Sequence, residues 1–203
     1  MNVSGMKKTL APILMLFLSA GYATAQNPDI DILRRINAPN PVRQTFWLET
    51  SNSVYWVPPV YAVANLGYGL IGKDRVALRY SMESALSAGI GLALTGCIKN
   101  LVNRPRPAQA YPDIIGTYIY SEGKSFPSGH TTLAFATATT LALQGGHWYI
   151  SVPVFSWPLA VGYSRMRLGR HYPTDVLCGA VIGIGSGLLS HWIAGRIMPG
   201  TTH

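Results

Sequence analysis

Five long apolar segments dominate the sequence and limit what it can fold into. They lie at about residues 53–72, 80–98, 130–146, 148–163 and 175–194. A helix that crosses the hydrocarbon core of a bilayer needs about 20 apolar residues, and most of these segments approach that length. Only 12% of the residues are charged, about half the share of an average soluble domain. The pattern predicts an all-α protein, a polytopic membrane helix bundle with about five spans.

The first and fourth segments are the weakest candidates for membrane spans. Pro58 and Pro59 interrupt the first. The fourth, 148–163, would form about 24 Å of helix, against a hydrocarbon core of about 30 Å. A soluble bundle with buried helices therefore remains an alternative. Glu83 lies within the second segment, and its carboxylate is expected to reach an interface or a partner rather than lipid.

The N-terminal region has the pattern of an export signal. Lys7 and Lys8 precede an apolar run, and small residues follow at 23–25, as at a signal-peptide cleavage site. We expect residues 1–25 to be a cleaved signal peptide; if retained, they would form a sixth span. Residues 26–52 are polar and mixed and contain a short amphipathic piece at 30–36. They are expected to form a periplasmic or interfacial segment that precedes a helical domain at 53–203.

Counting spans from an exported residue 26 gives the orientation. Two polar stretches, 99–129 and 164–174, then share the outer face of the membrane. The same orientation follows if residues 1–25 are retained as a span. The cytoplasmic loops and the C-terminal end receive several cations, as the positive-inside rule prefers: Lys73, Arg75, Arg79 and Arg196.

The outer stretches hold cations in short polar islands, within a chain of net charge +8. Nucleic-acid binding would need clustered basic residues on a polar element, often with interleaved aromatics. The isolated islands instead favour a membrane partner and no nucleic acid. The cations concerned are Lys99, Arg104, Arg106, Lys124, Arg165, Arg167 and Arg170.

Pro127-Ser128-Gly129 predicts a helix start that could bind an anion. Such a start offers a hydroxyl cap and free backbone amides at the positive end of the helix dipole, and Gly129 would let an anion approach the backbone. An ordinary serine cap would give the same pattern.

His171 and Asp175 are four residues apart. If a helix begins near Pro173, the carboxylate can reach one imidazole nitrogen, which leaves the other as a nucleophile. A purely structural pair is an equal alternative. The basic residues Lys99, Arg106 and Arg165 could likewise anchor headgroups, although the arginine fork suits phosphoryl oxygens.

Taken together, three motifs resemble the type 2 phosphatidic acid phosphatase (PAP2) superfamily at every position. In chain order they are Lys99-x6-Arg106-Pro107, Pro127-Ser128-Gly129-His130 and Ser164-Arg165-x5-His171-x3-Asp175. The resemblance covers residues 99–175 directly and 53–194 more loosely. Membrane members usually have six spans, whereas this chain has five after processing. The resemblance implies that 53–203 is a PAP2-like phosphatase domain.

The resemblance also implies a metal-free mechanism without a cofactor. His171 would attack phosphorus to form a phosphohistidine, Asp175 would orient it, and His130 would serve as acid and then base. Five residues would hold the phosphoryl oxygens: Lys99, Arg106, Ser128, Gly129 and Arg165. Independently, the stretch 99–175 contains three acidic residues, Asp113, Glu122 and Asp175, too few for a two-metal carboxylate site.

The expected substrate is a phospholipid or glycolipid phosphate at the periplasmic face of a bacterial inner membrane. A compact exported member resembles the lipid A phosphatases. Undecaprenyl diphosphate, phosphatidylglycerol phosphate and phosphatidic acid are rival substrates that the motifs cannot separate. Soluble periplasmic acid phosphatases share the motifs, and a non-catalytic headgroup-binding membrane protein is a further alternative.

Several other residues are given structural interpretations. His147 and His191 are expected to be structural histidines. Cys97 and Cys178 are expected to be small buried hydrophobes, although a disulfide is open. Arg104, Arg167 and Arg170 match no motif position, and either enlarge a positive funnel or face headgroups.

Overall fold

The computed structural model describes residues 28–37, 41–117 and 122–200, and the predicted signal peptide at 1–25 lies outside them. Within these residues the regular structure is helical, as predicted. The elements are α2 (Pro28–Ile36), α3 (Pro41–Asn52), the 3-10 turn η1 (Ser53–Tyr55), α4 (Val57–Gly72), α5 (Arg75–Val102), α6 (Pro107–Ala110), α7 (Gly129–Gly145), α8 (Trp148–Arg167) and α9 (Pro173–Ile197).

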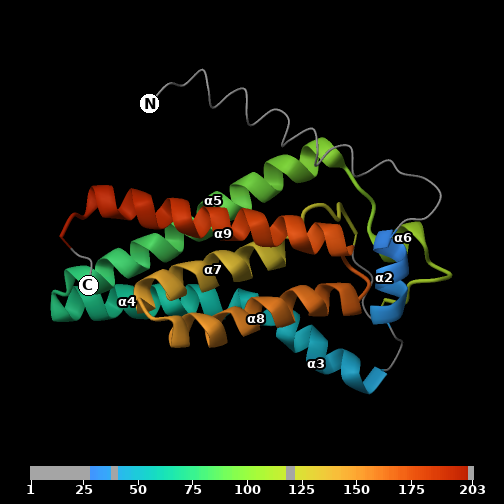
Figure 1. Ribbon diagram of the computed structural model, residues 1–203, viewed down its shortest axis with the longest axis horizontal. Coiled ribbons are helices and arrows are strands. Elements are labelled where there is room, and N and C mark those ends of the chain that lie inside the picture. The colour runs from blue at the N-terminus through green and yellow to red at the C-terminus, as the bar shows by residue number, and fades with distance from the viewer. Residues whose placement is uncertain (1–27, 38–40, 118–121, 201–203) are drawn as a thin grey trace.

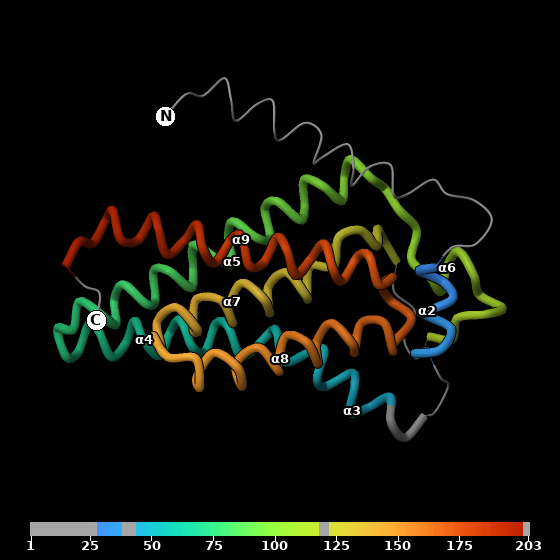
Figure 2. The backbone as a smooth tube through the Cα atoms, viewed as in Figure 1, coloured from blue at the N-terminus to red at the C-terminus, as the bar shows by residue number. Residues whose placement is uncertain are grey.

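The five predicted apolar segments form the five long helices, α4, α5, α7, α8 and α9, which lie along one another in an elongated bundle (Figure 1). Helix α7 packs against α5, α8 and α9. The short helices α2 and α6 lie together at one end of the bundle (Figure 2). The amphipathic piece predicted at 30–36 is part of α2, whereas α3 was not anticipated.

Two helices extend further than the apolar segments that predicted them. Helix α5 runs to Val102 and α8 to Arg167, so Lys99 and Arg165 lie in last helical turns rather than in loops. Helix α4 begins at Val57, later than the predicted segment, which begins at residue 53. Pro58 then lies in the first turn, where a backbone N–H would have no intrahelical acceptor, so the N–H that proline lacks is not needed. The cations thus project from rigid helix ends.

The bundle has small polar residues inside and large apolar residues outside. The buried face of α7 includes Thr131, Thr132 and Thr140. Large apolar side chains are exposed on α4 and α9, among them Val60, Val63, Leu70, Val181, Leu188 and Trp192. A soluble bundle would hide such a surface from water, whereas lipid accepts it. The distribution favours the membrane bundle over the soluble alternative.

Two stretches of the described chain are long and apolar enough to cross a membrane: Arg75–Ala110, which contains α5, and Pro173–Ile197, which is α9. The full count of five spans stays a prediction.

Glu83 is completely buried at the interface of three helices. It contacts Arg79 Nε at 2.7 Å through Oε1 and accepts a hydrogen bond from Gln144 Nε2 at 2.9 Å. His191 Nδ1 lies 3.1 Å from the same carboxylate. The glutamate therefore contacts protein partners and not lipid. His191 lies in this buried cluster, as expected of a structural histidine.

Of the other residues that were given structural interpretations, His147 and Cys178 are as expected and Cys97 is not. His147 is the N-cap of α8, and its ring stacks on Tyr149 with centroids 5.0 Å apart. Both cysteines are free: Cys178 is buried, but Cys97 is exposed, so the expectation of burial was wrong for Cys97.

Helices α7 and α9 approach closely because α9 presents a row of glycines to α7. A Cβ atom on Gly179 would lie 2.7 Å from the Ser128 carbonyl oxygen, and one on Gly187 would lie 2.6 Å from Thr139 Cβ. Gly183, between them, faces the backbone of Thr132 in the same way. Small residues that let backbones approach are typical of membrane helix packing.

We expect Gly183→Ala to destabilise the bundle, because the added methyl group would meet the backbone of α7. Overpacking costs about 1–3 kcal/mol, and each kcal/mol lowers Tm by about 2–4 °C in a chain of this size. Thermal unfolding in detergent measures the effect. The control is Gly185→Ala on the same helix, where a Cβ meets nothing within 4 Å. Equal melting temperatures for the two variants would contradict the packing argument.

Candidate active site

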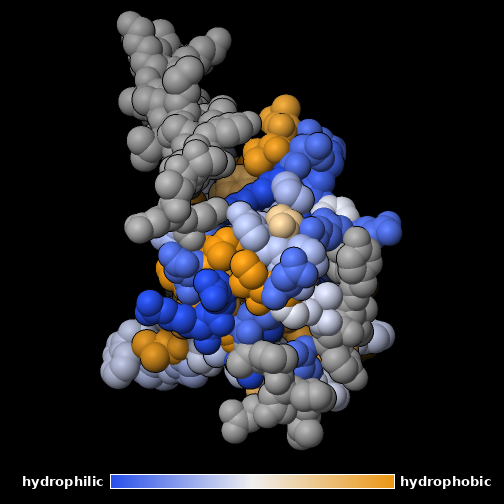
Figure 3. Space-filling view, turned by 90° about the vertical axis from the view of Figure 1, so that its right-hand side faces the viewer, coloured by the Kyte–Doolittle hydropathy of each residue, from blue (hydrophilic) through white to orange (hydrophobic). Residues whose placement is uncertain are grey.

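The polar end of the bundle collects the residues that the sequence motifs singled out. The C-terminal end of α8 and the N-terminal end of α9 lie there beside α2 (Figure 1). Figure 3 looks onto this end, where hydrophilic side chains cover most of the described surface. The eight predicted residues lie at helix ends or in the adjoining loops: Lys99, Arg106, Ser128, Gly129, His130, Arg165, His171 and Asp175.

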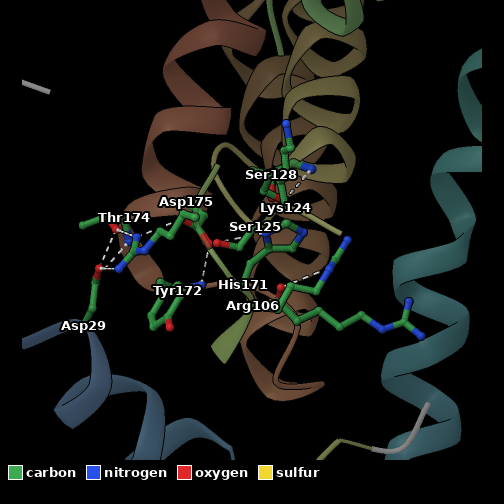
Figure 4. Close-up of polar contacts among 12 residues, drawn as sticks. Asp29, Arg106, Lys124, Ser125, Ser128, His171, Tyr172, Thr174 and Asp175 are labelled. Carbon is green, nitrogen blue, oxygen red and sulfur yellow. Dashed lines mark hydrogen bonds and ion pairs between the residues drawn. The ribbon is translucent and has the colours of Figure 1, made fainter. Parts of the chain in front are cut away.

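His171 and Asp175 form a buried pair. Helix α9 begins at Pro173, so Asp175 lies in its first turn and accepts a hydrogen bond from Tyr172 N at 2.9 Å. The other partner of the same oxygen, Oδ2, is His171 Nδ1 at 3.4 Å. Figure 4 shows the imidazole directed toward the carboxylate. The two side chains therefore lie next to each other as predicted, although Nδ1 makes no hydrogen bond within the described residues. Nε2 is the nitrogen that does not face Asp175.

The surroundings of His171 favour its neutral form. Its side chain is 2% exposed, and this burial is the main reason that its pKa lies well below the usual value. The positive charges of Arg165, Arg106 and Lys99 lower that pKa further. The imidazole is consequently unprotonated at neutral pH, as a nucleophile must be.

Ser128 connects two of the motifs. Its N–H donates to the Asp175 carbonyl oxygen at 3.0 Å, and its buried hydroxyl caps α7 by accepting from Thr131 N at 3.4 Å. These contacts are those of a structural cap, so a role for this hydroxyl in phosphate binding stays a prediction.

The next two amides of α7, at Gly129 and His130, have no intrahelical acceptor in a first turn and can serve an anion. A Cβ on Gly129 would have an ordinary contact, 3.7 Å from Thr95 Cγ2. The protein packing therefore does not itself demand glycine there.

The three motif cations are held by neutral oxygens. Arg165, 2% exposed, donates from Nη1 to Ser51 Oγ at 2.7 Å. Arg106 donates from Nη1 to the Arg170 carbonyl at 3.2 Å, and Lys99 Nζ donates to the Lys124 carbonyl at 2.8 Å. Arg106 Nε and Arg165 Nε are buried without a hydrogen-bond partner in the described part of the chain. The cluster thus keeps spare donors, which suit an oxyanion.

His130 completes the site from the second position of α7. Its Nε2 is buried and has no hydrogen-bond partner among the described residues. Its ring packs edge-on against Tyr55, with centroids 5.1 Å apart. His130 is close enough to Arg165 and His171 to interact with both electrostatically.

Sequence reasoning missed several residues that support the site. Ser51 fixes Arg165, and Ser125 hydrogen-bonds Asp175 and, through its backbone, His171. Arg104 contacts Asp175 directly, at 2.9 Å. The sequence had named Arg104, two positions before a motif arginine, but had assigned it to a positive funnel or to headgroups and not to Asp175. The other missed residues are Asp29 and Tyr55. Arg170, which the sequence assigned to a positive funnel or to headgroups, supplies the carbonyl that accepts from Arg106.

Comparison with known proteins agrees with these motifs. The chain is 32% identical to the lipid A 1-phosphatase of Porphyromonas gingivalis over 97% of its own length, and spans 41% of that relative. It is 28% identical to the lipid A 4'-phosphatase of Bacteroides thetaiotaomicron, over 78% of this chain and 74% of that one.

A solved structure shares the fold. The transmembrane PAP2-type phosphatidylglycerolphosphate phosphatase of Bacillus subtilis superimposes with a TM-score of 0.76 at 20% identity, covering 95% of this chain and 97% of that one. The PAP2 superfamily profile matches residues 81–199, more than half of the sequence. The chain therefore belongs to the PAP2 superfamily.

Proposed function

We propose that the protein is a metal-independent phosphatase that removes phosphate from a lipid headgroup at the periplasmic face of a bacterial inner membrane. One observation carries this proposal. A buried, neutral His171 is paired with Asp175 beside cations whose contacts are with neutral oxygens. Such a site binds a phosphoryl group and presents a nucleophile to it.

In the proposed reaction, His171 Nε2 attacks phosphorus. The N–P bond forms while the bond from phosphorus to the lipid oxygen breaks. His130, which becomes protonated once the negatively charged phosphoryl group is bound beside it, gives that proton to the lipid oxygen. A water molecule then attacks the phosphohistidine and passes a proton to His130. The N–P bond breaks, inorganic phosphate leaves, and Asp175 stabilises the charge that His171 carries during both steps.

The cations supply the electrostatic stabilisation. Lys99, Arg106 and Arg165 offset the negative charge on the phosphoryl oxygens, and the first amides of α7 add donors. Removing one such donor typically costs about 2.7–4 kcal/mol of barrier. The same donor set disfavours a divalent metal ion, because Asp175, the carboxylate among the motif residues, is already shared with Arg104.

Lipid A phosphate is the proposed substrate, supported by the activities named for the two relatives. Undecaprenyl diphosphate, phosphatidylglycerol phosphate and phosphatidic acid present the same phosphoryl chemistry and are the alternatives. The apolar outer surface favours a lipid substrate over the soluble acid phosphatase alternative. A non-catalytic headgroup-binding protein would need neither His130 nor the His171 pair.

We expect His171→Ala to lower phosphate release by about a thousandfold or more, because the reaction loses its nucleophile. The assay uses purified protein in detergent with a chelator present, on lipid A, undecaprenyl diphosphate, phosphatidylglycerol phosphate and phosphatidic acid. Wild-type protein should act fastest on lipid A. His147→Ala is the control, since that ring stacks at the start of α8. Turnover by His171→Ala at the parental rate would refute the mechanism.

We expect Arg106→Gln to move the acid limb of the kcat/KM profile to higher pH. Protonation inactivates His171, and the charge of Arg106 helps to keep the pKa of His171 low. Without that charge the pKa rises toward its usual value, so activity is lost at a higher pH on acidification. Arg196→Gln, in the last turn of α9, is the control. A limb that stayed in place or moved to lower pH would contradict the electrostatic account.

The proposed orientation can be tested with reporter fusions. A reporter inserted near Asp113, on the loop that follows α6, should behave as periplasmic, and one placed after Gly145, at the end of α7, as cytoplasmic. The opposite pattern would place the site on the cytoplasmic side.

A further inference from the structure

A line of ionic contacts continues beyond the proposed catalytic pair. Asp175 Oδ1 contacts Arg104 Nη1 at 2.9 Å, and Arg104 Nη2 contacts Asp29 Oδ2 at 2.8 Å. The order is therefore His171, Asp175, Arg104, Asp29. Figure 4 shows Asp29 and His171 on opposite sides of Asp175. Asp29 belongs to α2, far in sequence from the PAP2 motifs.

Asp29 also holds the first turn of α9. Its Oδ1 accepts from Thr174 N at 3.1 Å, and its Oδ2 accepts from the Thr174 hydroxyl. The same hydroxyl oxygen accepts from Arg104 Nη1 at 2.8 Å. Because Thr174 directly precedes Asp175, one carboxylate fixes both the backbone that carries Asp175 and the guanidinium that binds it.

Arg104 is held differently from the motif cations. Its guanidinium bridges two carboxylates, and its Cζ lies 3.7 Å from the centroid of the Tyr172 ring. Arg106 and Arg165 instead rest on neutral oxygens and have buried Nε atoms without a partner in the described structure. Arg104 is thus committed to Asp29 and Asp175, while the other two arginines keep donors for an oxyanion.

A planar guanidinium that bridges two carboxylates restricts the orientation of both. Asp29 is 7% exposed and Asp175 0%, so the contacts lie largely out of water, where hydrogen bonds to charged groups are strong. A carboxylate held in this way has little freedom to rotate, and the imidazole facing it is aligned in turn.

We propose that Asp29 and Arg104 are positioning residues that orient Asp175, and through it His171, for attack on phosphorus. The inference rests on the proposed function of His171. It makes α2 a working part of the active site, although the sequence alone suggested only a segment lying along the membrane surface.

The test is Asp29→Asn, which keeps the size of the side chain but removes its charge. We expect kcat to fall about ten- to a hundredfold, as for the loss of a buried charged hydrogen bond, while KM changes less than about twofold, because the phosphate-binding cations are untouched. Asp29→Glu, which restores the carboxylate, should recover part of kcat. Asp31→Asn is the matched control, since Asp31 is exposed on the same helix and the change in net charge is identical.

The assay uses the lipid phosphate that wild-type protein releases fastest in the substrate panel, with thermal unfolding measured on every variant. If Asp29→Asn fails to fold, Arg104→Lys replaces it: the charge remains, but an ammonium cannot bridge two carboxylates as a planar fork does, so the same loss of kcat is expected. Wild-type kcat in the folded variant, or an equal loss in Asp31→Asn, overturns the inference. Activity in His171→Ala, or none in wild-type protein, would instead refute the proposed function and the inference with it.

Discussion

The close approach of α7 and α9 at their N-terminal ends is the contact on which the site depends. Gly179 leaves room for the Ser128 carbonyl, and the Ser128 amide donates to the Asp175 carbonyl at 3.0 Å. That hydrogen bond joins the motif that supplies His130 to the motif that supplies His171. A side chain in place of the glycine would force the helices apart and separate the two imidazoles. The glycine row of α9 is thus as much a condition for the site as the histidines themselves.

Buried charge is handled in opposite ways in two clusters of the molecule. Arg79 and Glu83 form an ion pair, and Gln144 donates a hydrogen bond to the same carboxylate. His191 Nδ1 lies 3.1 Å from it without a hydrogen bond in the described structure. Such a cluster has little tendency to attract a ligand.

The motif cations at the polar end have neutral hydrogen-bond partners, so their mutual repulsion is offset only in part, by the nearby Asp175. A bound phosphoryl group would supply the missing negative charge. The uneven distribution of counter-ions therefore separates a structural cluster from a site that is suited to bind an anion.

The sequence predicted the five long helices and the motif residues because each leaves a local signal. Apolar segments have the length of a span, and the residues assigned to phosphate have identities set by chemistry. Ser51 and Asp29 left no such signal, because their importance arises when α3 meets α8 and α2 meets α9. The apolar segments predicted that α5 and α8 end earlier than they do. Hydropathy assigns the basic residues of a last helical turn to a loop. They remain helical because the last turn lies at the polar end of the bundle.

The same geometry explains why the motifs leave the lipid unidentified. Lys99, Arg106 and Arg165 are suited to the phosphoryl group, which every candidate substrate shares. Discrimination must therefore come from residues that face the rest of the headgroup. Tyr55 borders the site from outside the motifs: it is 58% exposed, and its ring packs against His130. It lies in the short turn η1, outside the PAP2 motifs that supply the phosphate-binding groups.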